Sequence, residues 1–187
     1  MRLIYTLGLL SFCILLMLQF TFCKNEQDAK ALALQQAHIS LKKGYEAYLD
    51  SESINKIILD IQNEGLNQNH LTSLDSLSNR LVKKIDGDIG EMVKWKSNYR
   101  NTELFDSTIE YLEVIMRYEK QIPEFFRFLS NSTEEKNVEA KNNMRSLALL
   151  VKEQGDNWGR SKILFYNKFG IKQKEIDSIE RMVRSVD

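Results

Sequence analysis

The sequence predicts an all-α protein, a compact bundle of about six helices that follows an N-terminal signal segment. Apolar residues recur in steps of three and four almost throughout the chain, which is the spacing of a helix with one buried face. No stretch alternates convincingly with period two, so no sheet is expected. One proline and eight glycines are the only strong helix breakers.

The first half of the chain divides into three predicted helical regions. One apolar stripe runs along a helix from about residue 26 to 49, and a shorter stripe at residues 54–61 ends at Gly65. A third stripe keeps its phase from Leu74 to Tyr99. Gly87 lies within this stripe, after two lysines that suit a helix end and before acidic residues that suit a helix start. These residues predict a break or sharp kink near Gly87.

The second half contains the remaining predicted helices. One begins near residue 103 and should kink or end at Pro123, because proline removes a donor and clashes with the preceding turn. Another opens at Ser132 and stops near Gly155. The last elements are a short segment at residues 163–169, closed by Gly170, and a helix that carries Ile176, Ile179, Val183 and Val186.

The N-terminus has the layout of an export signal. Arg2 precedes an uncharged run at residues 3–23, and the chain then turns sharply polar. This run is also long enough to cross a bilayer as a helix, since about 20 apolar residues suffice. The predicted division is a signal peptide at residues 1–22 and a single helical domain at residues 23–187. That domain has no cysteine after Cys23, so it has neither a disulfide nor a thiolate metal site.

The segment Phe20-Thr21-Phe22-Cys23 resembles the lipobox of bacterial lipoproteins, a four-residue motif that ends in the modified cysteine. Thr21 suits the pattern, whereas Phe20 and Phe22 replace a branched aliphatic and a small residue. The resemblance implies that Cys23 is the acyl acceptor and first mature residue. Two or more acyl chains would hold the domain stably on a membrane. Lys24 stands where an aspartate would imply the inner membrane, so the outer membrane is favoured in a cell that has one.

Two other outcomes stay open for this segment. An ordinary signal peptidase could cut after Cys23 and release the domain. Alternatively, the segment remains as a single-pass anchor with Arg2 on the cytoplasmic side. Asn25 is a good helix start two residues after Cys23, and no flexible stretch separates them. The domain is therefore expected to lie close to the membrane surface.

Charge gives little information about partners. Basic and acidic residues number 26 each and are interleaved along the chain. Because no basic field is visible, nucleic acid is not an expected partner. The expected partners are the membrane, through the lipid anchor, and an envelope protein or peptide.

No metal or cofactor site is predicted. His38 lies on an apolar stripe and His70 in a turn, and no Glu-x-x-His pair accompanies them. The stretch "DGDIGE" at residues 86–91 starts like a calcium loop but lacks the glycine and the glutamate required later in the motif. Three methionines could in principle supply an axial sulfur to a haem, namely Met92, Met116 and Met144.

Enzymatic activity is not indicated, although the sequence does not exclude it. Asp106, Glu110 and Glu113 lie within two turns of one predicted helix. This spacing is typical of a solvent-exposed helix face. No nucleophile elbow, zinc-protease motif or phosphate-binding loop is present. A hydrolase that uses carboxylates therefore stays as an alternative to a binding or interaction module.

Two aromatic clusters are the candidate binding residues. They occur in "IPEFFRFL" and "NWGRSKILFYNKFG". Aromatic side chains dominate cores, so packing inside the bundle is the simpler interpretation. The functional interpretation is an exposed surface for a partner. Its residues would be Phe125, Phe126, Phe128, Trp158, Phe165 and Tyr166.

Overall fold

The computed structural model describes the backbone of residues 2–131 and 134–185, and the side chains of residues 27–131 and 137–185. Over these ranges the chain is helical and contains no strand, so the all-α prediction is confirmed. The described residues form five helices rather than about six. They are α1 (Arg2–Glu64), α2 (Gln68–Lys96), α3 (Glu103–Asn131), α4 (Glu134–Lys168) and α5 (Gln173–Arg184).

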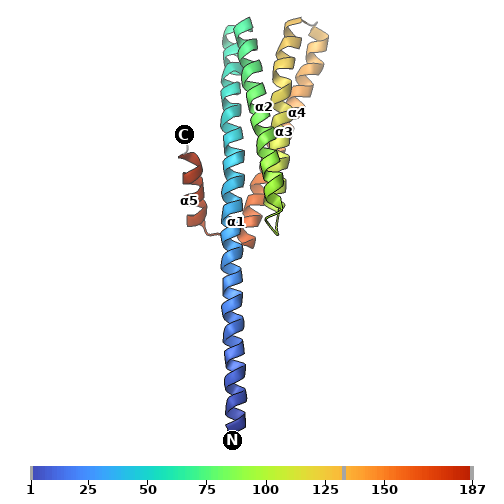
Figure 1. Cartoon of the computed structure of the whole chain (residues 1–187). Helices are drawn as coiled ribbons and strands as arrows, with labels where there is room; N and C mark the ends of the chain where they lie inside the picture. Colours follow the sequence, from blue (N-terminus) through green and yellow to red (C-terminus); the bar gives the residue numbers. More distant parts are fainter. Residues whose placement is uncertain (1, 132–133, 186–187) are drawn as a thin grey trace.

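Four helices form an up-and-down bundle (Figure 1). Successive helices run in opposite directions and pack as neighbours, and α1 also packs against α3. The N-terminal part of α1 continues beyond the bundle, and the short α5 lies beside α1. The end of the bundle from which α1 projects is called the base. It contains the α2–α3 loop and the end of α4.

Two glycines close helices as the sequence predicts. Gly65 has a φ of +88° at the end of α1, and Gly170 has a φ of +58° after α4. Glycine adopts this left-handed region without a Cβ penalty. Asn67 then caps α2, because its side chain accepts a hydrogen bond of 2.9 Å from the backbone N–H of His70.

The predicted helix interruptions are wrong. Helix α1 has no start at Asn25 and no break near residue 50. Helix α2 passes through Gly87, and α4 passes through Gly155. The start predicted at Ser132 lies outside the described residues. Tertiary packing overrides the local signals, since the apolar stripes keep one phase across each supposed break.

Helix α3 also continues through Pro123, where a kink or end was predicted. Pro123 is buried together with Ile122 and Phe126, so the proline ring contributes to the core. The missing N–H leaves the carbonyl of Glu119 without its usual donor one turn earlier. Burial of the flanking apolar residues keeps the helix in place despite this loss.

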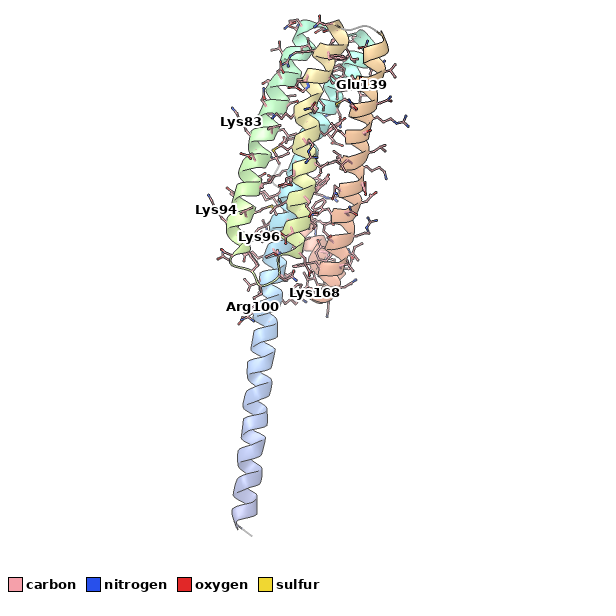
Figure 2. All side chains as sticks on the ribbon, turned by 90° about the vertical axis from the view of Figure 1, so that its right-hand side faces the viewer. Lys83, Lys94, Lys96, Arg100, Glu139 and Lys168 are labelled. Atoms are coloured by element: carbon pink, nitrogen blue, oxygen red, sulfur yellow. The ribbon has the colours of Figure 1, made fainter. Side chains whose placement is uncertain are left out.

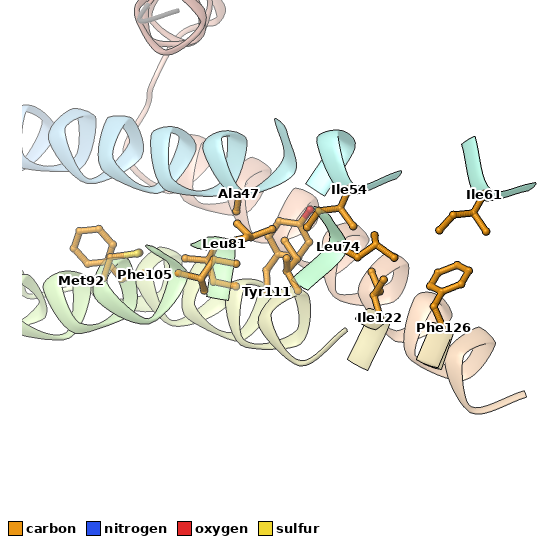
Figure 3. Packing of buried hydrophobic residues seen from close by; sticks show 13 residues of the cluster. Ala47, Ile54, Ile61, Leu74, Leu81, Met92, Phe105, Tyr111, Ile122 and Phe126 are labelled. Carbon is orange, nitrogen blue, oxygen red and sulfur yellow. The ribbon is translucent and has the colours of Figure 1, made fainter. Parts of the chain in front are cut away.

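The main core fills the space between α1, α2 and α3 (Figure 3). Its apolar side chains occupy inward positions over residues 47–61 of α1 and along most of α2 and α3. They are Ala47, Ile54, Ile61, Leu74, Leu81, Ile85, Met92, Phe105, Tyr111, Leu112, Ile115, Ile122 and Phe126.

A second, smaller core lies nearer the base and joins α1, α3, α4 and α5. It consists of Ala33, Ala37, Leu41, Leu104, Phe165, Tyr166, Ile171, Ile179 and Val183. Ile179 and Val183 were predicted on the last helix, and both are buried in this cluster. An ion pair of 2.9 Å between Lys30 and Glu175 adds a polar link between α1 and α5.

Candidate functional site

A cavity of about 440 Å³ lies at the base of the bundle and is called the basal cavity. Its walls come from the N-terminal part of α1 within the bundle, the α2–α3 loop and the residue that follows α4. The apolar lining consists of Ala29, Leu32, Ala33, Tyr99 and Phe169. This size is within the range of small-molecule sites, about 300–1,000 Å³.

The polar lining is concentrated on α1 and on the α2–α3 loop. It consists of Asp28, Gln36, Asn98, Arg100 and Asn101. Gln36 is only 2% exposed, and its Nε2 has no hydrogen-bond partner among the described residues. Arg100 is exposed, and Figure 2 labels it at the end of the bundle from which α1 projects. An apolar chamber with a few polar groups is the usual form of a ligand site.

The loop that carries Arg100 is fixed by its neighbours. The rings of Tyr99 and Phe105 pack nearly perpendicular to each other, with centroids 5.1 Å apart. The same burial raises the pKa of the Tyr99 phenol. Asn101 Oδ1 accepts a hydrogen bond of 3.3 Å from the backbone N–H of Glu103 at the start of α3. The loop therefore presents its polar side chains from an anchored backbone.

The basal cavity is close to the predicted acylation position along α1. The side chain of Cys23 lies outside those that the structure describes, but its backbone belongs to the same helix as Asp28 and Gln36. At 1.5 Å per residue, these two positions lie roughly 8 and 20 Å along the helix from Cys23. One continuous helix thus connects the apolar N-terminal segment to the cavity wall.

The six aromatic candidates do not form one surface. Phe125 and Phe126 pack against each other in the C-terminal half of α3, with centroids 5.3 Å apart, whereas Trp158 lies on α4. Phe126, Phe165 and Tyr166 are buried in the two cores. Phe125 and Trp158 are half-buried, and Phe128 is 40% exposed. Three of the six side chains are therefore core residues in this fold.

Trp158 joins three helices. Its indole Nε1 donates a hydrogen bond of 2.9 Å to Thr108 Oγ1, and its ring stacks on Tyr111 at 5.0 Å. Nζ of Lys162 lies 4.0 Å from the centroid of the same ring. Burial lowers the pKa of this lysine. These contacts account for Trp158 as a residue that packs helices together rather than one that binds a partner.

A buried carboxyl group lies between α1 and α3. Glu119 is 1% exposed, and Ser51 Oγ donates to its Oε1 at 2.6 Å. Burial raises the pKa of Glu119 to about 7, although the hydrogen bond from Ser51 lowers it. Glu119 Oε2 has no partner among the described residues. Glu119 does not line the basal cavity.

The "DGDIGE" stretch forms part of α2. Two of its carboxylates form ion pairs with α1. Lys43 on α1 contacts Asp88 at 2.5 Å and Glu91 at 3.1 Å. Burial lowers the pKa of Lys43, but hydrogen bonds to these two carboxylates outweigh it and raise the pKa overall. Among the side chains that the structure describes, no group of three potential ligands could hold a metal ion.

The other candidate residues are placed separately. His38 is half-buried on α1, and Nδ1 of His70 lies 3.1 Å from the carbonyl oxygen of Gly65. Met92, Met116 and Met144 all pack in or against the main core. Asp106 pairs with Lys96 and accepts a hydrogen bond of 2.8 Å from Thr102, whereas Glu110 and Glu113 are exposed.

No protein-family model matches this chain, and no match was found among curated proteins or solved structures. Within the part of the chain whose side chains are described, no helix combines the length and apolar character that a membrane span requires. The basal cavity is thus defined by geometry alone.

Proposed function

We propose that the chain is a bacterial envelope lipoprotein, anchored through acylated Cys23, whose helical bundle is a binding module outside the cytoplasm. The observation that carries this proposal is the continuity of α1, which joins the segment containing Cys23 to the wall of the basal cavity. The lipobox resemblance at residues 20–23 supports acylation, and Lys24 favours the outer membrane. The binding site of the module is the basal cavity.

The continuous helix supports a bundle held close to the bilayer. A domain that captures distant partners needs a flexible tether of glycine, serine or asparagine-rich sequence. Here the chain after Cys23 continues as helix into the cavity wall. A partner or ligand at the membrane surface therefore fits the geometry better than a distant one.

A second candidate is an uncleaved single-pass protein that carries the same bundle. The uncharged run at residues 3–23 favours it, since this run is long enough to span a bilayer as a helix. In that case the basal cavity would still lie near the membrane surface. The carboxylate hydrolase has less support, because the buried Glu119 is outside the cavity.

The deciding experiment is the intact mass of the full-length gene product, extracted from membranes, beside a Cys23→Ala variant. We expect a mature chain that starts at Cys23 and carries acyl chains, and we expect the variant to lose both features. A full-length unmodified mass in both proteins would establish the anchor instead. An unmodified chain that starts at Lys24 would indicate a released exported protein.

A further inference from the structure

We propose that the basal cavity binds a single-chain amphiphile, that is, one acyl chain with an anionic or zwitterionic head group. This inference rests on the proposed function for the source of the ligand, which is the adjacent bilayer. The binding chemistry itself follows from the residues of the cavity.

The apolar lining of the cavity suits an acyl chain. Leu32, Ala33 and Phe169 contribute side chains without polar atoms, and the Tyr99 ring is fixed by its contact with Phe105. Leu32 is 46% exposed, which is high for a leucine beside a core. Covering this surface with an apolar chain removes it from water and favours binding.

The groups that can bind a head group are Arg100 and two amides. No ion pair joins Arg100 to any carboxylate of the described residues, so its guanidinium is available. Such a group binds carboxylate or phosphate oxygens through paired hydrogen bonds. Asn101 Oδ1 accepts from the backbone N–H of Glu103, and its amide also donates to the Glu103 carboxylate, so one amide N–H remains as a donor. Asn98 lies on the same loop and adds a second amide.

Two further residues narrow the choice of ligand. Asp28 lines the cavity together with Arg100, so a head group with two negative charges would be repelled by its carboxylate. A monoanionic carboxylate meets about half of this repulsion, and a zwitterionic head group can place its cationic part beside Asp28. Gln36 Nε2 is buried in the wall without an acceptor, and a ligand oxygen or a water that it holds would satisfy the amide.

The test measures binding of radiolabelled decanoate to the full chain in phosphatidylcholine nanodiscs by equilibrium dialysis, with empty nanodiscs subtracted. Saturable binding is expected. Arg100→Gln should weaken it about tenfold or more, because a charge-assisted hydrogen bond is lost. Arg145→Gln makes the same change on the exposed face of α4 and should leave affinity unchanged.

A second variant tests the apolar lining. Ala29 is exposed at the cavity wall, so Ala29→Phe fills the space without disturbing the core. We expect weaker decanoate binding with unchanged helical content. Absence of saturable binding to the wild-type chain, or equal affinity in all three variants, would overturn the proposal.

A competition arm identifies the source of the ligand. A zwitterionic lysophospholipid with a ten-carbon chain is added to the decanoate complex. Displacement assigns the site to lipids with a phosphate head group, and lack of displacement assigns it to free fatty acids. Both results support a single-chain amphiphile.

The Cys23→Ala variant separates this inference from the proposed function. Decanoate reaches the cavity from solution, so the variant should bind it as tightly as the wild type. An acylated wild-type chain that does not bind decanoate would refute the ligand while the anchor stands. A wild-type chain that binds decanoate but carries no acyl group at Cys23 would refute the anchor while the ligand site stands.

Discussion

Gly44 on α1 provides the space that the indole of Trp158 on α4 occupies. A Cβ built on Gly44 would lie 2.5 Å from Cζ2 of Trp158, closer than real side chains approach. The indole instead packs on bare helix backbone and reaches Thr108 on α3. This glycine is therefore a packing requirement within a helix interior, where glycine usually costs stability.

Gly44→Ala should destabilise the bundle. The added methyl gains up to about 1 kcal/mol of helix propensity, but overpacking against a held ring costs about 1–3 kcal/mol. We expect a net loss of about 1–2 kcal/mol in the free energy of unfolding, measured by urea denaturation followed by circular dichroism.

Gly90→Ala is the matched control. Gly90 also lies inside a helix, but a Cβ there meets nothing within 4 Å. The same substitution should stabilise by about 0.5–1 kcal/mol, because only propensity changes. Equal effects at the two positions would show that the indole moves away at little cost.

Thr108→Val should destabilise the bundle, because it removes the hydroxyl that accepts the indole hydrogen bond. Thr108 Oγ1 accepts from Trp158 and donates to the Leu104 carbonyl at 2.6 Å. Valine keeps the shape but leaves the indole N–H without an acceptor, at a cost of about 1–3 kcal/mol. In a Trp158→Phe background the cost should fall by about 1 kcal/mol, because no N–H is then orphaned. Additive effects in the double variant would contradict the coupling.

The helical fold could be predicted from the sequence, but the number of helices could not. Apolar spacing predicted helices throughout, and the glycines at 65 and 170 marked real ends. The false breaks came from treating Gly87, Pro123 and Gly155 as local signals. Each lies where the neighbouring turns are held by packing, and sequence alone does not weigh packing against propensity.

The candidate site was not predictable in the same way. Asp28, Gln36 and Arg100 follow no motif, and they meet only because α1, the α2–α3 loop and the end of α4 converge at the base. The sequence feature that could have pointed to this site was Gln36, a polar residue between the apolar Ala33 and Ala37. Aromatic content pointed instead to residues that the fold uses largely for its two cores.

Asp88→Asn should destabilise the α1–α2 contact. The Lys43 side chain is only 15% exposed and relies on Asp88 and Glu91 to balance its charge. Removing the nearer carboxylate leaves a largely buried cation with one exposed partner, which should cost about 1–3 kcal/mol. Asp156→Asn is the control, because its pair with Lys152 is exposed and should change stability by less than about 0.5 kcal/mol. A similar small loss at both sites in urea denaturation would contradict the importance of burial.

Glu119 should make the bundle less stable as the pH rises from about 4.5 to about 7. Its pKa in the folded chain is about 7, above its ordinary value of 4.5, so the folded chain holds a proton that the unfolded chain has lost. In this window the unfolded state binds fewer protons, and the free energy of unfolding therefore falls with pH. The full loss is about 3 kcal/mol, and it should level off above pH 7.

Glu119→Gln tests this assignment because it keeps the size and a hydrogen-bonding partner for Ser51 but cannot ionise. Urea midpoints measured from pH 4.5 to 8 should slope downward in the wild type and flatten in the variant. Glu113→Gln changes an exposed carboxylate on the same helix and should keep the wild-type slope. A slope that survives in Glu119→Gln would assign the pH dependence to another group. A slope lost in both variants would show that it reflects the overall charge of α3 rather than the buried position.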